Sequence, residues 1–132
     1  MFKIAKERFG MKFAFSGTVT IDEMKQWSEQ ALKALPGQPK DFGVLVDNRE
    51  LRPGGIQPEA LKLLMDTQAS YKKAGMARSC VILQSAAVTM QLERTARESG
   101  IGAFERYINA SIEPKWEAKA IAWLEKKIDP NF

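Results

Sequence analysis

The feature that most constrains this chain is a unit of one mainly apolar stretch followed by a helical stretch, which occurs three times after residue 41. Short apolar runs are typical of strands that are buried on both faces, as in a parallel sheet. Strands that alternate with helices favour right-handed crossovers and helices packed on the sheet. The units predict strands at 42–47, 79–84 and 104–108 and helices at about 58–74, 89–98 and 113–128.

The N-terminal part adds two strands and one helix. Apolar and polar residues alternate at 2–6 and 12–18, which predicts a hairpin whose first strand is an antiparallel edge strand. Thr20 and Glu23 have the spacing of a capping box, in which each residue satisfies a backbone donor of the other. We therefore predict a helix at about 21–35.

The order β-β-α-β-α-β-α-β-α predicts a single α/β domain over residues 1–132, with a mainly parallel sheet and four helices. The helix at 58–74 is expected to bury a stripe formed by Leu61, Leu64, Met65, Gln68 and Tyr71. The last helix is expected to be buried through Trp116, Ala120, Trp123, Leu124 and Ile128. Other residues expected in the core are Trp27, Val44, Val46, Val81 and Leu83.

Composition excludes several kinds of chemistry. The net charge is only +4 and the basic residues are spread along the chain, so we predict no nucleic-acid binding. The chain has no histidine, the commonest metal ligand and general base, and no metal or cofactor is predicted. Cys80 lies in an apolar run and is expected to be a buried core residue. No apolar run reaches the length of a membrane span, and we expect a cytoplasmic protein.

The chain resembles the SpoIIAA-like, or STAS/SEC14-like, family of small bacterial α/β domains. The resemblance covers nearly the whole chain and rests on the order of its elements, with local matches at 44–49, 104–107 and 118–124. In STAS domains, the loop after the strand that matches 42–46 presents a serine or threonine whose phosphorylation switches binding to an anti-sigma kinase.

The segment at 47–57 contains no hydroxyl residue, so we predict that the phosphorylation switch is absent. The nearest serines, Ser28 and Ser70, lie in predicted helices. What the resemblance still implies is a loop and helix terminus that bind a protein partner or a small anion. The predicted binding residues are Asp47, Arg49, Arg52, Gly54 and Gly55.

A simpler interpretation of the same segment remains open. The two arginines can pair with Asp47, Glu50 or Glu59, while the two glycines only turn the chain. The guanidinium groups would then serve the fold and would leave little charge for a ligand.

The functional prediction is a non-catalytic STAS-like interaction or ligand-binding module with a regulatory role. One alternative is a small-molecule or lipid-binding protein, and another is an enzyme that uses pocket carboxylates. Methionine and aromatic side chains are abundant enough to line an apolar pocket, although an ordinary core is the favoured interpretation. The residues in question are Met11, Phe13, Phe15, Met24, Trp27, Met65, Met76 and Met90.

Overall fold

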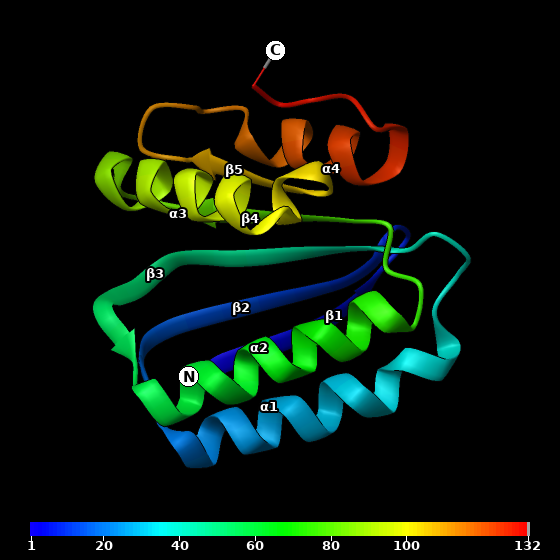
Figure 1. Cartoon of the computed structure of the whole chain (residues 1–132), viewed down its shortest axis with the longest axis vertical. Coiled ribbons are helices and arrows are strands. Elements are labelled where there is room, and N and C mark those ends of the chain that lie inside the picture. The colour runs from blue at the N-terminus through cyan, green and yellow to red at the C-terminus, as the bar shows by residue number, and fades with distance from the viewer. Residues whose placement is uncertain (132) are drawn as a thin grey trace.

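The computed structural model describes residues 1–131, apart from the side chains at positions 91, 95 and 99, and contains one five-stranded sheet. The strands lie across it in chain order (Figure 1): β1 (Phe2–Glu7), β2 (Gly10–Val19), β3 (Gly43–Ile56), β4 (Arg78–Leu83) and β5 (Glu105–Asn109). β1 is antiparallel to β2, and the other neighbouring strands are parallel. The predicted α/β class and the antiparallel edge strand are confirmed.

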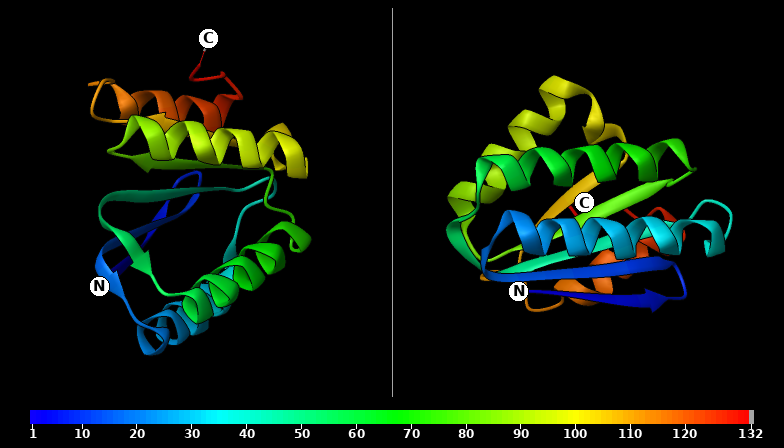
Figure 2. Two further views of the ribbon diagram at one scale, coloured as in Figure 1. Left: turned by 60° about the vertical axis from the view of Figure 1, so that its left-hand side comes forward. Right: turned by 90° about the horizontal axis from the view of Figure 1, so that it is seen from below.

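Helices cover both faces of the sheet. They are α1 (Ile21–Ala34), α2 (Pro58–Lys73), α3 (Ala86–Ser99) and α4 (Trp116–Lys126), with short 3-10 helices η1 (Leu35–Gly37) and η2 (Ile101–Ala103). From β2 to β5 the sheet grows in one direction, each strand lying next to the one before it. Right-handed crossovers therefore put α1, α2 and α3 on one face of the sheet. α4 follows the last strand and covers the opposite face, as the right-hand view of Figure 2 shows.

Two apolar cores result from this arrangement. The larger core lies between the sheet and α1–α3 and contains edge-to-face aromatic contacts of Phe13 with Trp27 and Tyr71, at centroid distances of 5.2 and 5.7 Å. The smaller core lies under α4, around Trp123 and Cys80. Seven of the side chains expected to be buried are at most 9% exposed: Trp27, Val44, Val46, Leu64, Val81, Leu83 and Trp123. Burial also raises the pKa of the Cys80 thiol to about 12, so it stays protonated in the core.

The start of α1 forms as its sequence predicts. The Glu23 backbone N–H donates to Thr20 Oγ1 at 3.2 Å, and the Thr20 backbone N–H donates to Glu23 Oε1 at 3.4 Å. Both donors would otherwise lack an intrahelical partner, so the capping box fixes the residue at which the helix begins.

The predicted apolar stripes are wrong in part. Leu61 and Met65 are 45% and 60% exposed, because α2 buries Ala60 and Thr67 against α1 instead. α4 ends at Lys126 and Lys127 is left-handed, so Ile128 lies beyond the helix and is 54% exposed. In the part of the chain that the structure describes, no helix combines the length and the apolar character needed to cross a bilayer.

The segment predicted as a loop after residue 47 is instead a continuation of β3. β4 pairs with β3 only as far as Asp47, but β2 continues to Val19 and supplies a partner for the rest of the strand. Register shifts accommodate the extra residues: Ala14 lies opposite Asp47, whereas Val19 lies opposite Ile56. The bulged strand therefore replaces a free loop at this edge of the sheet.

Candidate functional site

Asp47 and Arg49 form a tight pair within β3. Arg49 donates from Nε to Asp47 Oδ1 at 3.0 Å and from Nη2 to Oδ2 at 2.9 Å, and its backbone N–H also donates to Oδ1 at 3.1 Å. Its guanidinium lies 4.3 Å from the centre of the Trp116 ring on α4. The simpler interpretation of Arg49, pairing within its own segment, is confirmed.

This pair gives the protein an acid-sensitive contribution to stability. Burial by itself would raise the pKa of Asp47, but the hydrogen bonds and charge of Arg49 lower it below its ordinary value. A lowered folded-state pKa means that the pair stabilises the fold above about pH 3.9 and that this stabilisation disappears as the pH falls through the folded-state pKa. Because the Arg49 side chain is 40% exposed, we expect Asp47→Asn to lower the unfolding free energy by only about 1 kcal/mol at neutral pH.

Urea unfolding of wild type and Asp47→Asn at neutral pH and below about pH 3 measures this difference. We expect the difference to shrink in acid. Glu50→Gln is the control, since Glu50 is an exposed neighbour that forms no ion pair with a described residue. A difference that stays constant between the two pH values would show that Asp47 does not act through its charge.

The remaining predicted binding residues do not converge with this pair. Arg52 is exposed and forms no ion pair with any described acid. Gly54 is left-handed, with φ +68°, and a Cβ on Gly55 would lie 2.5 Å from the Gly17 carbonyl oxygen. Gly55 thus allows β3 to approach β2 closely. Ligand binding by this segment stays a prediction.

The structure contains a second candidate site, a cavity of about 370 Å³ between α2, η2 and the sheet. We call it the α2–η2 pocket. Its floor and walls are mostly apolar and include Phe13, Val44, Val46, Leu64, Ile101 and Phe104. This size and lining are typical of sites for small organic ligands.

The pocket exists because α2 is held against α1 and away from α3. The hydroxyls of Ser28 on α1 and Thr67 on α2 lie 2.7 Å apart in a hydrogen bond, and the Tyr71 hydroxyl donates to the carbonyl oxygen of Ala31. α3 packs instead over β5. Figures 1 and 2 show that α2 and α3 are separated from each other over the face of the sheet formed by β3 and β4.

The favoured interpretation of the methionine and aromatic residues was an ordinary core, and it holds for all of them except Met65 and Met90, which are exposed. Met11, Phe15 and Met24 are fully packed core residues. Lining residues of the α2–η2 pocket come from the same set: Phe13, Trp27, Met65 and Met76. Phe13, Trp27 and Met76 therefore belong to the larger core and also border the pocket.

One polar group among the pocket-lining side chains lacks a partner. Trp27 is 1% exposed, and no described residue accepts a hydrogen bond from its indole Nε1–H. Buried donors are nearly always hydrogen-bonded, and an unpaired one costs about 1–3 kcal/mol. The free protein therefore keeps an unsatisfied donor within the larger core.

The other end of the pocket carries a buried polar cluster. The Ser79 hydroxyl donates to Glu105 Oε1 at 2.9 Å, and the Tyr107 hydroxyl donates to Glu105 Oε2. Burial and the charge of Glu105 raise the pKa of Tyr107, so this hydroxyl remains a donor. Nothing in the sequence marked this cluster, because its residues come from two strands that become neighbours only in the sheet.

Catalysis by paired carboxylates requires two acids in one cavity. Glu105 is the one carboxylate among the described residues that line the α2–η2 pocket. Lys72 also lines the pocket; its ammonium lies 4.2 Å from the centre of the Phe104 ring and donates to the Met76 carbonyl oxygen at 3.3 Å. This arrangement suits ligand binding better than acid–base chemistry.

No family model matches the sequence, and no curated protein matches it either. The resemblance to the SpoIIAA-like family, its bacterial origin and its regulatory role therefore stay predictions. The absence of a phosphorylation switch is also still a prediction. Ser28 is buried and hydrogen-bonded to Thr67, whereas Ser70 is exposed on α2.

Proposed function

We propose that the protein is a non-catalytic binding module for a small, mainly apolar ligand, which it holds in the α2–η2 pocket. The observation that carries this proposal is the cavity itself, about 370 Å³ of mostly apolar space above β3 and β4. Each methylene group that a ligand buries there contributes about 0.8 kcal/mol. Affinity would thus come mainly from burial of apolar surface.

One further feature supports this pocket as the ligand site. Its lining is mostly apolar, whereas a hollow of similar volume over β1 and β2 is lined by charged side chains such as Lys3, Glu7 and Lys12. A STAS-like interaction surface on β3 is less well supported, because Arg49 is already paired with Asp47.

Filling the pocket mouth should abolish binding. Ala69 lines the pocket from the exposed side of α2, so Ala69→Phe places a ring in the entrance without disturbing the buried face of the helix. We expect wild type to bind the fluorescent apolar dye N-phenyl-1-naphthylamine saturably and Ala69→Phe to bind it at least about tenfold more weakly. Dye fluorescence titration measures both affinities.

Ser70→Phe is the matched control. It puts the same ring at the next position of α2, where the side chain is exposed and lies outside the pocket lining. We expect its affinity for the dye to equal that of wild type. Equal weakening in both variants, or no saturable dye binding by wild type, would contradict the proposed function.

A further inference from the structure

The Glu105 carboxylate is held in place by neutral donors alone. Ser79 and Tyr107 each donate one hydrogen bond to it, one to each oxygen. A carboxylate has about four acceptor positions, so both oxygens can accept another bond. Glu105 forms no ion pair with any described lysine or arginine, and it lines the α2–η2 pocket. The pocket therefore contains a carboxylate whose two hydrogen-bond donors are fixed and which has no cationic partner among the described residues.

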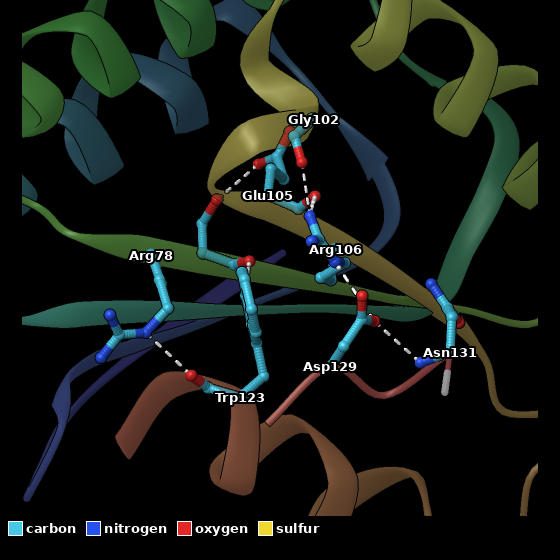
Figure 3. A network of polar contacts seen from close by, with 8 residues as sticks. Arg78, Gly102, Glu105, Arg106, Trp123, Asp129 and Asn131 are labelled. Carbon is cyan, nitrogen blue, oxygen red and sulfur yellow. Dashed lines mark hydrogen bonds and ion pairs between the residues drawn. The ribbon is translucent and has the colours of Figure 1, made fainter. Parts of the chain in front are cut away.

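The neighbouring cation does not fill that role. Arg106 pairs with Asp129 at 3.3 Å and lies 4.3 Å from the centre of the Trp123 ring. It also donates to the main-chain carbonyl oxygens of Gly102 and Glu105, as Figure 3 shows for Gly102. Its guanidinium is thus used to hold the C-terminal segment, and the Glu105 side chain points away to Ser79.

We propose that the ligand of the α2–η2 pocket is an amphipathic amine, whose apolar chain fills the pocket and whose protonated amine binds the Glu105 carboxylate. This inference rests on the proposed function and adds the chemical class of the ligand. A charged carboxylate in a partly buried site gains more from a cation than from a neutral donor, because charge-assisted bonds are about twice as strong. Because Ser79 and Tyr107 already hold the carboxylate in position, ligand binding has to order few further side chains.

Lys72 argues against an amine ligand, because its ammonium group would attract a ligand that carries a carboxylate. Its ammonium is exposed and already interacts with the Phe104 ring and the Met76 carbonyl oxygen. Glu105 lies further from solvent and lacks a cationic partner. Because the Glu105 carboxylate is less solvated than the Lys72 ammonium and has no ion-pair partner among the described residues, its charge determines which ligand the pocket prefers.

The test compares octylammonium, octanoate and 1-octanol as competitors that displace N-phenyl-1-naphthylamine from the wild-type protein. The three probes have the same chain length, so any difference comes from the polar group. We expect octylammonium to bind roughly tenfold or more tightly than 1-octanol. Octanoate is expected to bind no better than 1-octanol. If octanoate or 1-octanol binds as tightly as octylammonium, the assignment is overturned.

Glu105→Gln removes the charge and keeps side-chain groups that can hydrogen-bond to Ser79 and Tyr107. In this variant, octylammonium should bind only as well as 1-octanol, while 1-octanol affinity stays at the wild-type value. Glu98→Gln makes the same change at an exposed position of α3 and should keep the amine preference. A preference that survives Glu105→Gln would also overturn the assignment.

The outcomes separate the two proposals. Dye binding without a preference for the amine removes only the ligand class and leaves the apolar pocket as a binding site. A wild-type protein that binds neither the dye nor any of the three probes removes the proposed function and this inference with it. Wild-type affinities alone decide both cases, so the conclusion does not depend on whether a variant folds.

Discussion

Replacing Trp123 with alanine is expected to lower the free energy of unfolding by about 3–5 kcal/mol. Trp123 is 3% exposed and fills the core under α4. Its indole Nε1–H donates to the Ser79 carbonyl oxygen at 3.0 Å, and the Arg106 guanidinium lies over its ring. The variant creates a cavity and removes these contacts together. Since domains are stable by only about 5–15 kcal/mol, urea unfolding should detect the loss easily.

Trp116→Ala is the control on the same helix. Trp116 is only half-buried at the start of α4, and its ring contacts Arg49. We expect a loss of about 1 kcal/mol. Similar losses for the two tryptophans would mean that the first turn of α4 holds the helix as strongly as the buried ring does.

Arg78 attaches α4 to the sheet independently of the Trp123 side chain. It donates to the carbonyl oxygens of Trp123 and Leu124 at 2.8 and 3.1 Å, which satisfies acceptors near the C-terminal end of α4. Figure 3 shows the contact with Trp123. A cation at this end also interacts favourably with the helix dipole. α4 is therefore attached to the start of β4 by backbone groups and by side chains; removal of the indole eliminates its bond to Ser79 but leaves the bonds from Arg78 in place.

The sequence predicted those elements whose signals are local. The capping pair of Thr20 and Glu23, the apolar run of β3 and the proline at the start of α2 each act within a few residues, so they determine structure without knowledge of the fold. The order of strands and helices then restricts the sheet to a few arrangements. This is why the α/β class and most of the buried residues were predictable.

The extent of β3 was not predictable in this way. Arg52, Pro53, Gly54 and Gly55 have low strand propensity, and a glycine-bearing loop was the natural interpretation. The segment is extended because β2 is long enough to pair with it through Val19, and that pairing is a long-range property. Bulges admit residues that a regular strand would exclude.

The pocket was unpredictable for a related reason. Met65 and Leu64 are adjacent in sequence and both line the pocket, but their chemistry does not tell which is buried and which is exposed. The position of α2 relative to α1 decides it, through the contact of Thr67 with Ser28. Glu105 likewise becomes part of the site only because β4 and β5 are neighbours.

Gly10→Ala is expected to lower the free energy of unfolding by more than about 3 kcal/mol. Gly10 is the first residue of β2 and has φ +148°, which side-chain-bearing residues rarely adopt. A Cβ there would lie 2.2 Å from the carbonyl oxygen of Gly43 on β3. That oxygen belongs to the backbone of a paired strand and cannot move aside without breaking the β2–β3 pairing. Urea unfolding measures the loss.

Gly17→Ala separates the clash from the backbone strain. Gly17 lies in the same strand with φ +62°, but a Cβ there would have no neighbouring atom within 4 Å. Its expected cost is the strain of a left-handed residue alone, about 1–2 kcal/mol. If both variants lose the same stability, close approach of β2 to β3 at Gly10 contributes nothing. A larger loss at Gly10 shows that the two parallel strands in the middle of the sheet need a position without a side chain where they begin to pair.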